Sequence, residues 1–222
     1  SFPLGSERKS GFLFPNIGHT TRSGFQLTVP WYWNIAPQYD LTLEPSLYTE
    51  RGFNLASEFR YLLPQQRGRL AIDYLPHDAL ADFGGKTNRD RSRVHLDHVA
   101  DLPQGWRVRI DAENVSDSFW YEDFAQGPEG TSLAFVKRLA EITYRDEHWR
   151  LRGEVQQFQT IDAALPASDR PYARLPGLEA RGDWHRGDSG QLAWGFDAEV
   201  ANFERNSGVE GWRADIAPRV GL

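Results

Sequence analysis

Apolar and polar residues alternate along most of this 222-residue chain. The clearest stretch runs from Phe25 to Ile35, where the odd-numbered residues are Phe, Leu, Val, Trp, Trp and Ile. The even-numbered residues between them are Gln, Thr, Pro, Tyr and Asn. Because successive side chains of a β-strand point to opposite faces, this pattern predicts a strand with one apolar and one polar face.

The alternation recurs along the chain and predicts an all-β, antiparallel fold. The expected strands are 10–17, 23–35, 37–49, 52–62, 67–76, 91–101, 104–117, 132–145, 148–160, 174–185, 190–205 and 209–222. Many of them are longer than the roughly 5–6 residues usual in soluble sheets. A tilted strand that crosses a membrane needs about 9–11 residues. The lengths therefore favour a transmembrane outer-membrane β-barrel, with about 11–12 of its strands in this chain.

The connections between the expected strands alternate in length. Short connections fall at 34–37, 62–67, 101–104, 145–148 and 185–190, and long ones at 17–23, 77–90, 114–131 and 160–173. The connections at 49–52 and 205–209 are short exceptions among the long set. Outer-membrane barrels have short periplasmic turns and longer external loops. The alternation therefore predicts that the first strand begins on the periplasmic side.

Large aromatic residues accompany the short connections and predict a periplasmic girdle. Trp and Tyr prefer the membrane interface, where an apolar ring and a polar atom are both accommodated. The expected girdle is Trp31, Trp33, Tyr39, Tyr61, Trp106, Tyr144, Trp149 and Trp184. Aromatic residues packed at one end of a soluble sandwich core are the alternative interpretation.

Charged residues on the polar side of the strands carry both signs, which suits a polar lumen. The expected lumen-facing residues are Asp40, Glu44, Glu58, Arg60, Asp73, Arg107, Arg109, Asp111 and Glu113. For any single one of them, a solvated and salt-paired wall without a specific ligand is the simpler interpretation, because exposed ion pairs usually have small energies.

Composition excludes several classes of site and partner. The chain has no Cys, which excludes a disulfide or a thiolate metal site within it. The net charge of −6, without a basic stripe, argues against nucleic-acid binding. No apolar run is long enough for a transmembrane helix, and the first residues lack the features of a signal peptide.

Two motifs could suggest catalysis, but neither is complete. Gly187-Asp188-Ser189-Gly190 is similar to a serine-protease nucleophile loop, yet companion motifs are missing, and a tight turn explains these residues better. Glu122 and Asp123 lie in a long aromatic loop, where they would fold the loop or bind ions. We therefore expect no enzyme activity, no catalytic residue, no metal and no cofactor.

Several segments resemble the family of LPS-assembly proteins LptD, also called OstA or Imp. They are Phe2–Pro15, Pro30–Leu43, Arg51–Leu62, Arg170–Pro176 and Gly211–Pro218, in the family's order over nearly the full chain. The segment Pro30–Leu43, which reads PWYWNIAPQYDLTL, is the most specific. The resemblance implies a large barrel of about two dozen strands. Residues 1–9 would end a periplasmic jelly-roll or linker, and residues 10–222 would form the N-terminal part of the barrel.

The resemblance also implies partners. The lipoprotein LptE would plug the barrel, lipopolysaccharide would be the substrate, and the LptA bridge would deliver it through the N-terminal domain. The family's disulfide cysteines flank the barrel and are not in this chain. The end at Gly221-Leu222 lacks the terminal aromatic residue typical of complete outer-membrane barrels. We expect a half barrel in the outer membrane of a Gram-negative bacterium.

The function implied is lipopolysaccharide export through the lumen and a lateral gate between the first and last strands. Pro15 and Pro30 fall in the first two expected strands, and each removes a ladder donor. We hypothesise that they weaken the gate; the alternative is that they mark strand ends. A porin-like or structural barrel and a soluble β-sandwich binding module remain alternatives to the whole interpretation.

Overall fold

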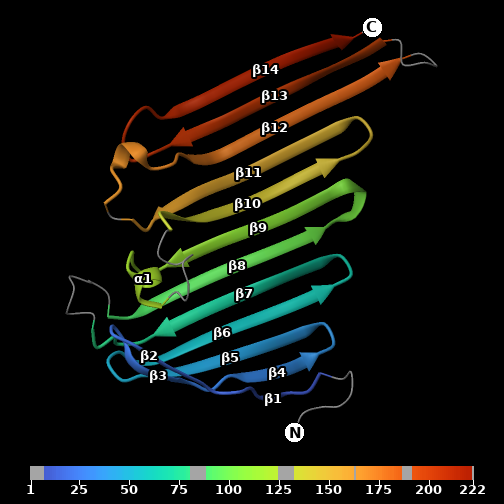
Figure 1. Cartoon of the computed structure of the whole chain (residues 1–222). Coiled ribbons are helices and arrows are strands. Elements are labelled where there is room, and N and C mark those ends of the chain that lie inside the picture. The colour runs from blue at the N-terminus through green and yellow to red at the C-terminus, as the bar shows by residue number, and fades with distance from the viewer. Residues whose placement is uncertain (1–7, 81–88, 125–132, 163, 187–191, 222) are drawn as a thin grey trace. The chain divides into compact units, whose positions relative to one another are not determined.

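The described residues form fourteen β-strands and a few short helical turns, whose order along the chain can be followed in Figure 1. The structure, a computed structural model, describes residues 8–80, 89–124, 133–162, 164–186 and 192–221. The expected motif at 187–190 and most of the expected linker at 1–9 lie outside these residues. In the described part, no helix is both long and apolar enough to span a membrane.

The chain divides into two compact units, which are described separately. The first unit comprises residues 1–97, 113–134 and 161–163, and the second comprises 98–112, 135–160 and 164–222. The first contains β1 (Gly11–Phe12), β2 (Asn16–Thr20), β3 (Gly24–Thr28), β4 (Trp31–Ala36), β5 (Tyr39–Tyr48), β6 (Gly52–Leu63), β7 (Gln66–Leu75), most of β8 (Arg91–Asp101) and the helix α1 (Trp120–Phe124).

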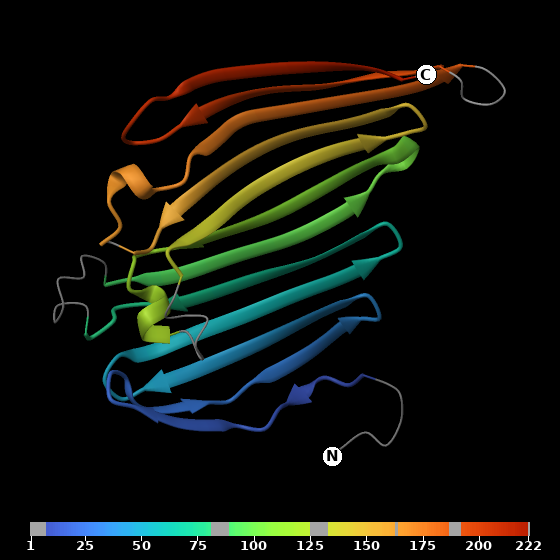
Figure 2. The same ribbon diagram turned by 45° about the horizontal axis from the view of Figure 1, so that its top comes forward.

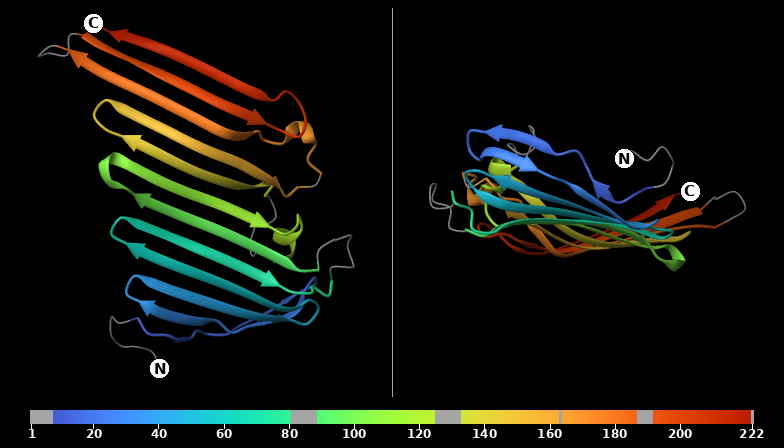
Figure 3. Two further views of the ribbon diagram at one scale, coloured as in Figure 1. Left: turned by 180° about the vertical axis from the view of Figure 1, so that it is seen from behind. Right: turned by 90° about the horizontal axis from the view of Figure 1, so that it is seen from below.

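The second unit contains β9 (Trp106–Val115) up to residue 112, then β10 (Phe135–Arg145), β11 (Trp149–Thr160), β12 (Ala173–Arg186), β13 (Leu192–Glu204) and β14 (Gly211–Gly221). Its short 3₁₀ turns are Pro103–Gly105 and Ala167–Asp169. Consecutive strands pair as antiparallel neighbours from β9 to β14, as the view from behind shows (Figure 3, left). The expected all-β antiparallel fold is confirmed.

In the first unit, the sheet order is β1-β4-β5-β6-β7-β8, and the β2–β3 hairpin joins it through β5. Turns of two residues connect β4 to β5 and β6 to β7. These turns agree with the short connections expected at 34–37 and 62–67. Tyr39 of β5 lies opposite Tyr61 of β6, so the apolar residues of these two strands lie on the same side of the sheet.

The predicted continuous strands 10–17 and 23–35 are wrong, because each is interrupted at a proline. The first is divided into β1 and β2, and the second into β3 and β4. Gly11 lies opposite Tyr32 and Asn16 lies opposite Thr28, so the register shifts by one residue between them. Residues 13–15 therefore face only residues 29–30, which is a β-bulge at Pro15 and Pro30.

Glycines on the apolar face of the second unit leave room for aromatic rings. A Cβ at Gly182 of β12 would collide with the ring of Trp184 and lie 3.0 Å from Phe196. Trp184 in turn packs edge-to-face on Trp149, with ring centroids 5.3 Å apart. A Cβ at Gly153 of β11 would meet only ordinary contacts at 3.4 and 3.5 Å. Of these two glycines, only Gly182 is required by the packing of its neighbours.

We expect Gly182→Ala to lower the free energy of unfolding by about 1–3 kcal/mol, because the Trp184 ring must move out of its packed position. Denaturant unfolding of the protein measures this change. Gly153→Ala is the matched control and should be neutral or slightly stabilising. Equal effects of the two substitutions would contradict the packing role of Gly182.

Candidate functional site

Ion pairs cover the polar face of the first unit's sheet. Asp40 accepts hydrogen bonds from Arg60 Nε and Nη2 at 2.8 and 3.1 Å. A second chain of contacts crosses three strands, since Arg93 lies 3.2 Å from Asp73 and 2.5 Å from Glu113. Charge-assisted pairs of this kind satisfy the polar groups across neighbouring strands.

The expected lumen-facing residues of this unit share that face. Register pairs place Asp40 opposite Arg60, and Ala56 opposite both Glu44 and Asp73. Glu58 joins them through Arg69, whose Nη1 lies 3.2 Å away. Arg8, from the expected linker, contacts Asp40 at 3.2 Å.

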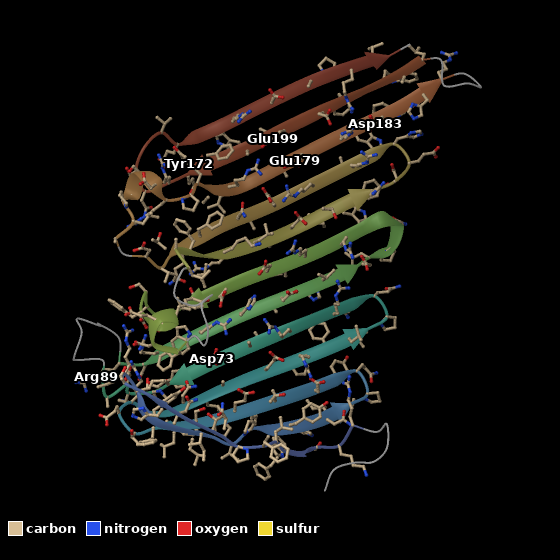
Figure 4. All side chains as sticks on the ribbon, in the orientation of Figure 1. Asp73, Arg89, Tyr172, Glu179, Asp183 and Glu199 are labelled. Carbon is tan, nitrogen blue, oxygen red and sulfur yellow. The ribbon has the colours of Figure 1, made fainter. Side chains whose placement is uncertain are left out.

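The second unit has a corresponding polar face. Lys137 lies 2.9 Å from Asp111, and Arg109 lies opposite Glu141. Arg107 pairs with Asp101 at 2.9 Å. Figure 4 shows Glu179 and Glu199 on neighbouring strands β12 and β13, where they extend the same kind of ladder. Its contacts are Arg152–Glu141 (2.6 Å), Arg152–Glu154 (2.7 Å), Arg152–Glu179 (3.1 Å), Arg174–Glu154 (2.7 Å) and the close Arg174–Glu199 pair.

The opposite face of each unit is apolar and exposed. Leu47 is 57% exposed in the first unit and Ile216 is 74% exposed in the second, which is far more than an apolar core permits. Other exposed apolar side chains include Phe53, Leu55, Ile72, Ile142, Val155, Leu178 and Val220. A sheet with exposed apolar residues along its strands requires an apolar environment or a covering partner.

Aromatic rings gather on these apolar faces beside the short turns. In the first unit, Tyr39 and Phe59 stack with centroids 6.2 Å apart. In the second, Trp106 packs against Tyr144 at 4.9 Å. The expected girdle residues Trp33, Tyr61, Trp149 and Trp184 lie close to short turns as well. Trp31 differs, since it begins β4 at the end away from the turn and contacts Trp33.

The interrupted first hairpin is the weakest part of the described ladder. β1 pairs with β4 over only two residues, Gly11 and Phe12. Leu13 N–H donates to Pro30 O at 2.8 Å, but Pro30 has no N–H to donate in return. This pair therefore has one ladder hydrogen bond where an ordinary hydrogen-bonded pair has two.

Two buried arginines lie at the end of the first unit's sheet where the longer loops connect the strands. Arg51 follows β5, and Arg91 begins β8; their side chains are 2% and 0% exposed. Arg51 lies 2.7 Å from both Asp78 and Asp123, and its Nε donates to Ser23 Oγ at 2.9 Å. We call Arg51, Arg91, Asp78, Asp117 and Asp123 the arginine cluster.

Arg91 completes the arginine cluster with a bidentate contact. Its Nε and Nη2 donate to the two carboxylate oxygens of Asp117, both at 2.9 Å. Its Nη1 contacts Asp78 at 3.1 Å and Asp123 at 2.5 Å. Two guanidinium groups therefore neutralise most of the charge of three carboxylates. Buried charges need such pairing, because an unpaired one is strongly destabilising.

The arginine cluster holds α1 against the sheet end. Asp123 belongs to α1, and the Phe124 ring lies under both guanidinium groups, with its centroid 5.1 Å from Arg51 Cζ and 4.8 Å from Arg91 Cζ. Cation–π contacts of this kind add to the ion pairs when they are desolvated. Figure 2 shows α1 beside the ends of the first unit's strands, and Figure 4 places Asp73 of β7 near it.

Sequence reasoning singled out only Asp123 of the arginine cluster. The expectation that Glu122 and Asp123 fold their loop agrees with the contacts of Asp123. The other members come from four separate segments, and no local spacing connects them. In the described residues, no group of three or more His, Asp or Glu could hold a metal ion.

Family models cover the chain in two overlapping parts. The model described as LPS transport system D matches residues 89–222, and the model described as LptD protein matches residues 1–139. The chain belongs to the LptD family. The matched LptD family is a transport family, which agrees with the expectation that the chain is not an enzyme.

Curated LptD relatives match nearly the whole chain. LPS-assembly protein LptD of Nitrosococcus oceani is 36% identical over 100% of this chain and 29% of its own length. The LptD of Alkalilimnicola ehrlichii is 37% identical over 99% of this chain and 28% of its own length. The chain therefore spans less than a third of the LptD relatives it matches.

Among solved structures, LpxR from Salmonella typhimurium covers 89% of this LptD-family chain, and 88% of that chain is covered. Its sequence identity is 10% and its TM-score is 0.25. A TM-score this low carries no argument about the fold.

We expect Arg91→Met to release α1 from the sheet, because it leaves Asp117 without a cation of the cluster and leaves Arg51 alone to neutralise Asp78 and Asp123. Breaking a buried pair typically costs about 3–5 kcal/mol. Limited proteolysis of the loop around α1, followed by mass spectrometry, measures the release.

Arg22→Met is the matched control. Arg22 also contacts α1, at Glu122 and at Asp123 (3.9 Å), but its side chain is 53% exposed. An exposed pair contributes at most about 1 kcal/mol. Protection of the loop in Arg91→Met equal to that in Arg22→Met would show that the arginine cluster does not hold α1.

Proposed function

We propose that this chain is the N-terminal part of an outer-membrane barrel that exports lipopolysaccharide and inserts it into the outer leaflet of a Gram-negative bacterium. The LptD family match across the chain is the observation that carries this proposal. The relatives are named LPS-assembly proteins, and the matched model describes a transport system. Neither a passive porin nor a soluble binding module accounts for those matches.

The two faces of the sheet suit the two halves of such a substrate. The exposed apolar faces contact the acyl chains of the membrane, because only apolar groups are tolerated there. The ion-paired polar faces line the lumen, where Asp40, Glu58 and Arg60 contact water, sugars or the plug lipoprotein LptE. The acyl chains of lipopolysaccharide thus move on the apolar, membrane side of the sheet, and its sugars move on the polar, lumen side.

The short turns lie at the periplasmic side in this proposal, and the aromatic residues beside them form the girdle. The linker before β1 then leads to a periplasmic domain, which receives lipopolysaccharide from the LptA bridge. On the opposite side, the arginine cluster and α1 lie at the external ends of the first unit's strands.

A lateral gate between the first and last strands of the full barrel lets the acyl chains leave. Residues of an antiparallel strand bond alternately to their two neighbours. In the interrupted second strand, made of β3 and β4, the backbone groups of Phe25 and Val29 bond to β5 and the loop after it. Pro30 therefore faces the interrupted first strand, made of β1 and β2, which receives no N–H donor from it. Pro15 lies in the bulge between Leu13, which bonds to Pro30, and Asn16, which pairs with Thr28, so the bulged segment of the first strand also lacks one donor beside the gate.

We expect Pro15→Ala combined with Pro30→Ala to slow delivery of lipopolysaccharide to the cell surface. Each restored hydrogen bond contributes about 0.5–1.5 kcal/mol. Two bonds, or roughly 1–3 kcal/mol, slow gate opening by about five- to 150-fold if opening limits the rate. Surface labelling of newly made lipopolysaccharide, in cells that depend on the variant, measures the delivery rate.

Pro218→Ala is the control, because Pro218 lies in β14, opposite Phe196 of β13 in the second unit. It should leave delivery unchanged. An unchanged rate in the Pro15/Pro30 double variant would refute the weakening role of these prolines. Failure of the unmodified full-length protein to support surface lipopolysaccharide at all would refute the proposed function itself.

A further inference from the structure

The residues just before β1 bond to the polar face of the first unit's sheet. The Asn34 N–H donates to Ser10 Oγ at 2.9 Å, and the Asn34 carboxamide nitrogen donates to the Arg8 carbonyl oxygen at 3.0 Å. The Arg8 side chain extends past β4, so that its Nη1 lies 3.2 Å from Asp40 of β5. We call residues 8–10 the strap.

The strap begins where the backbone ladder of β1 ends. Gly11 lies opposite Tyr32, and continuing that register would bring Lys9 opposite Asn34. In a regular hydrogen-bonded pair, the Asn34 N–H would then donate to the Lys9 carbonyl oxygen. It donates instead to the Ser10 hydroxyl, so a side-chain bond replaces the ladder at this end of β1.

β1 has little else that holds it on β4. Its backbone pairing covers only Gly11 and Phe12, and one further bond, from Leu13 N–H to Pro30 O, follows before the bulge. The Phe12 side chain is 76% exposed, so it adds little packing against the sheet. A short ladder opens easily, because few contacts must break at once. The strap therefore supplies much of what holds β1 in place.

The sheet side of the strap is already fixed. Asp40 is 4% exposed and accepts two hydrogen bonds from Arg60 and one, at 3.3 Å, from the Tyr32 hydroxyl. Asn34 lies opposite Asp40 in the register of β4 and β5. Both residues are thus held by the sheet before the strap binds, which lowers the conformational entropy lost when Arg8 docks.

The strap lies at the short-turn end of the polar face. Arg8 lines a cavity together with Pro37 and Gln38, which form the turn between β4 and β5. The bulge at Pro15 and Pro30 lies beyond the other end of β1. In the described part of the chain, β1 pairs with β4 alone and forms the edge of the sheet (Figure 1). This edge strand is therefore fastened at one end and interrupted at the other.

We propose that Asn34 and Asp40 are positioning residues that fasten the strap, so that β1 stays on β4 while its other edge separates from its partner during export. The fastened end acts as a hinge, and the bulge lets the strand beyond it move. The contacts of the strap do not depend on the activity of the protein. Their use in export rests on the proposed function, which supplies the edge that opens.

The test uses the full-length protein, purified with its natural partner lipoprotein in detergent. Hydrogen–deuterium exchange followed by mass spectrometry reports how often the Leu13 N–H leaves Pro30 O. Arg8→Gln combined with Ser10→Ala removes the ion pair and the hydroxyl acceptor and leaves every residue of the sheet unchanged. We expect exchange in the peptide that contains Leu13 to become about tenfold faster.

Lys9→Gln is the matched control. Lys9 carries a positive charge in the same segment, but it makes no hydrogen bond or ion pair with the residues that the structure describes. Its variant should exchange as slowly as the unmodified protein. Ser10→Thr, which keeps the hydroxyl acceptor, should also exchange slowly. If the double variant fails to fold, Ser10→Ala alone should speed exchange about threefold.

The double variant should also slow delivery of lipopolysaccharide to the cell surface severalfold, because a first strand that leaves β4 no longer forms a defined edge. Surface labelling in cells that depend on the variant measures the delivery rate. Lys9→Gln and Ser10→Thr should deliver at the unmodified rate. A loss of charge alone would affect Lys9→Gln as well, so this comparison isolates the contacts of the strap.

Unchanged exchange in the folded double variant, or in folded Ser10→Ala, would overturn the fastening of the strap. Faster exchange with an unchanged delivery rate would overturn its role in export. Absence of surface lipopolysaccharide in cells that carry only the unmodified protein would instead refute the proposed function. The exchange measurement needs no export, so it would still decide whether the strap is fastened.

Discussion

The antiparallel backbone ladder is the constraint on which the rest of this protein depends. It alternates both the direction of hydrogen bonding and the side of each residue, so every strand has two faces and two edges. In each unit the apolar residues are therefore exposed on one face, and the charged residues lie in contact on the other. Ion pairs across neighbouring strands let a charged face persist without isolated charges.

The same ladder makes the first hairpin different from the others. Pairing extends over ten residues between β5 and β6, but over only two between β1 and β4. The interruption coincides with two prolines, each of which lacks the donor that the ladder uses. Local loss of donors thus weakens the pairing at this edge of the first unit's sheet without altering the two faces.

Folding of the long loops follows a different principle. The arginine cluster buries two guanidinium groups and three carboxylates where no strand register requires them. Its stability depends on mutual satisfaction, since any one member left alone would be costly. By fixing Asp123, the cluster places the aromatic residues of α1 over the polar face of the first unit, where they line one side of a cavity. Charge pairing in the loops thus shapes a space that the sheet by itself would leave open.

The alternation in the sequence by itself determined the all-β class, most strand positions, the two faces and the short turns, because these depend on a local period of two residues. The resemblance carried by Pro30–Leu43 and its companion segments determined the family. Only the tertiary structure decided that the first two strands are each divided at a proline, since the bulge depends on register with a partner strand. It alone also assembled the arginine cluster, because these contacts join residues that no local pattern links.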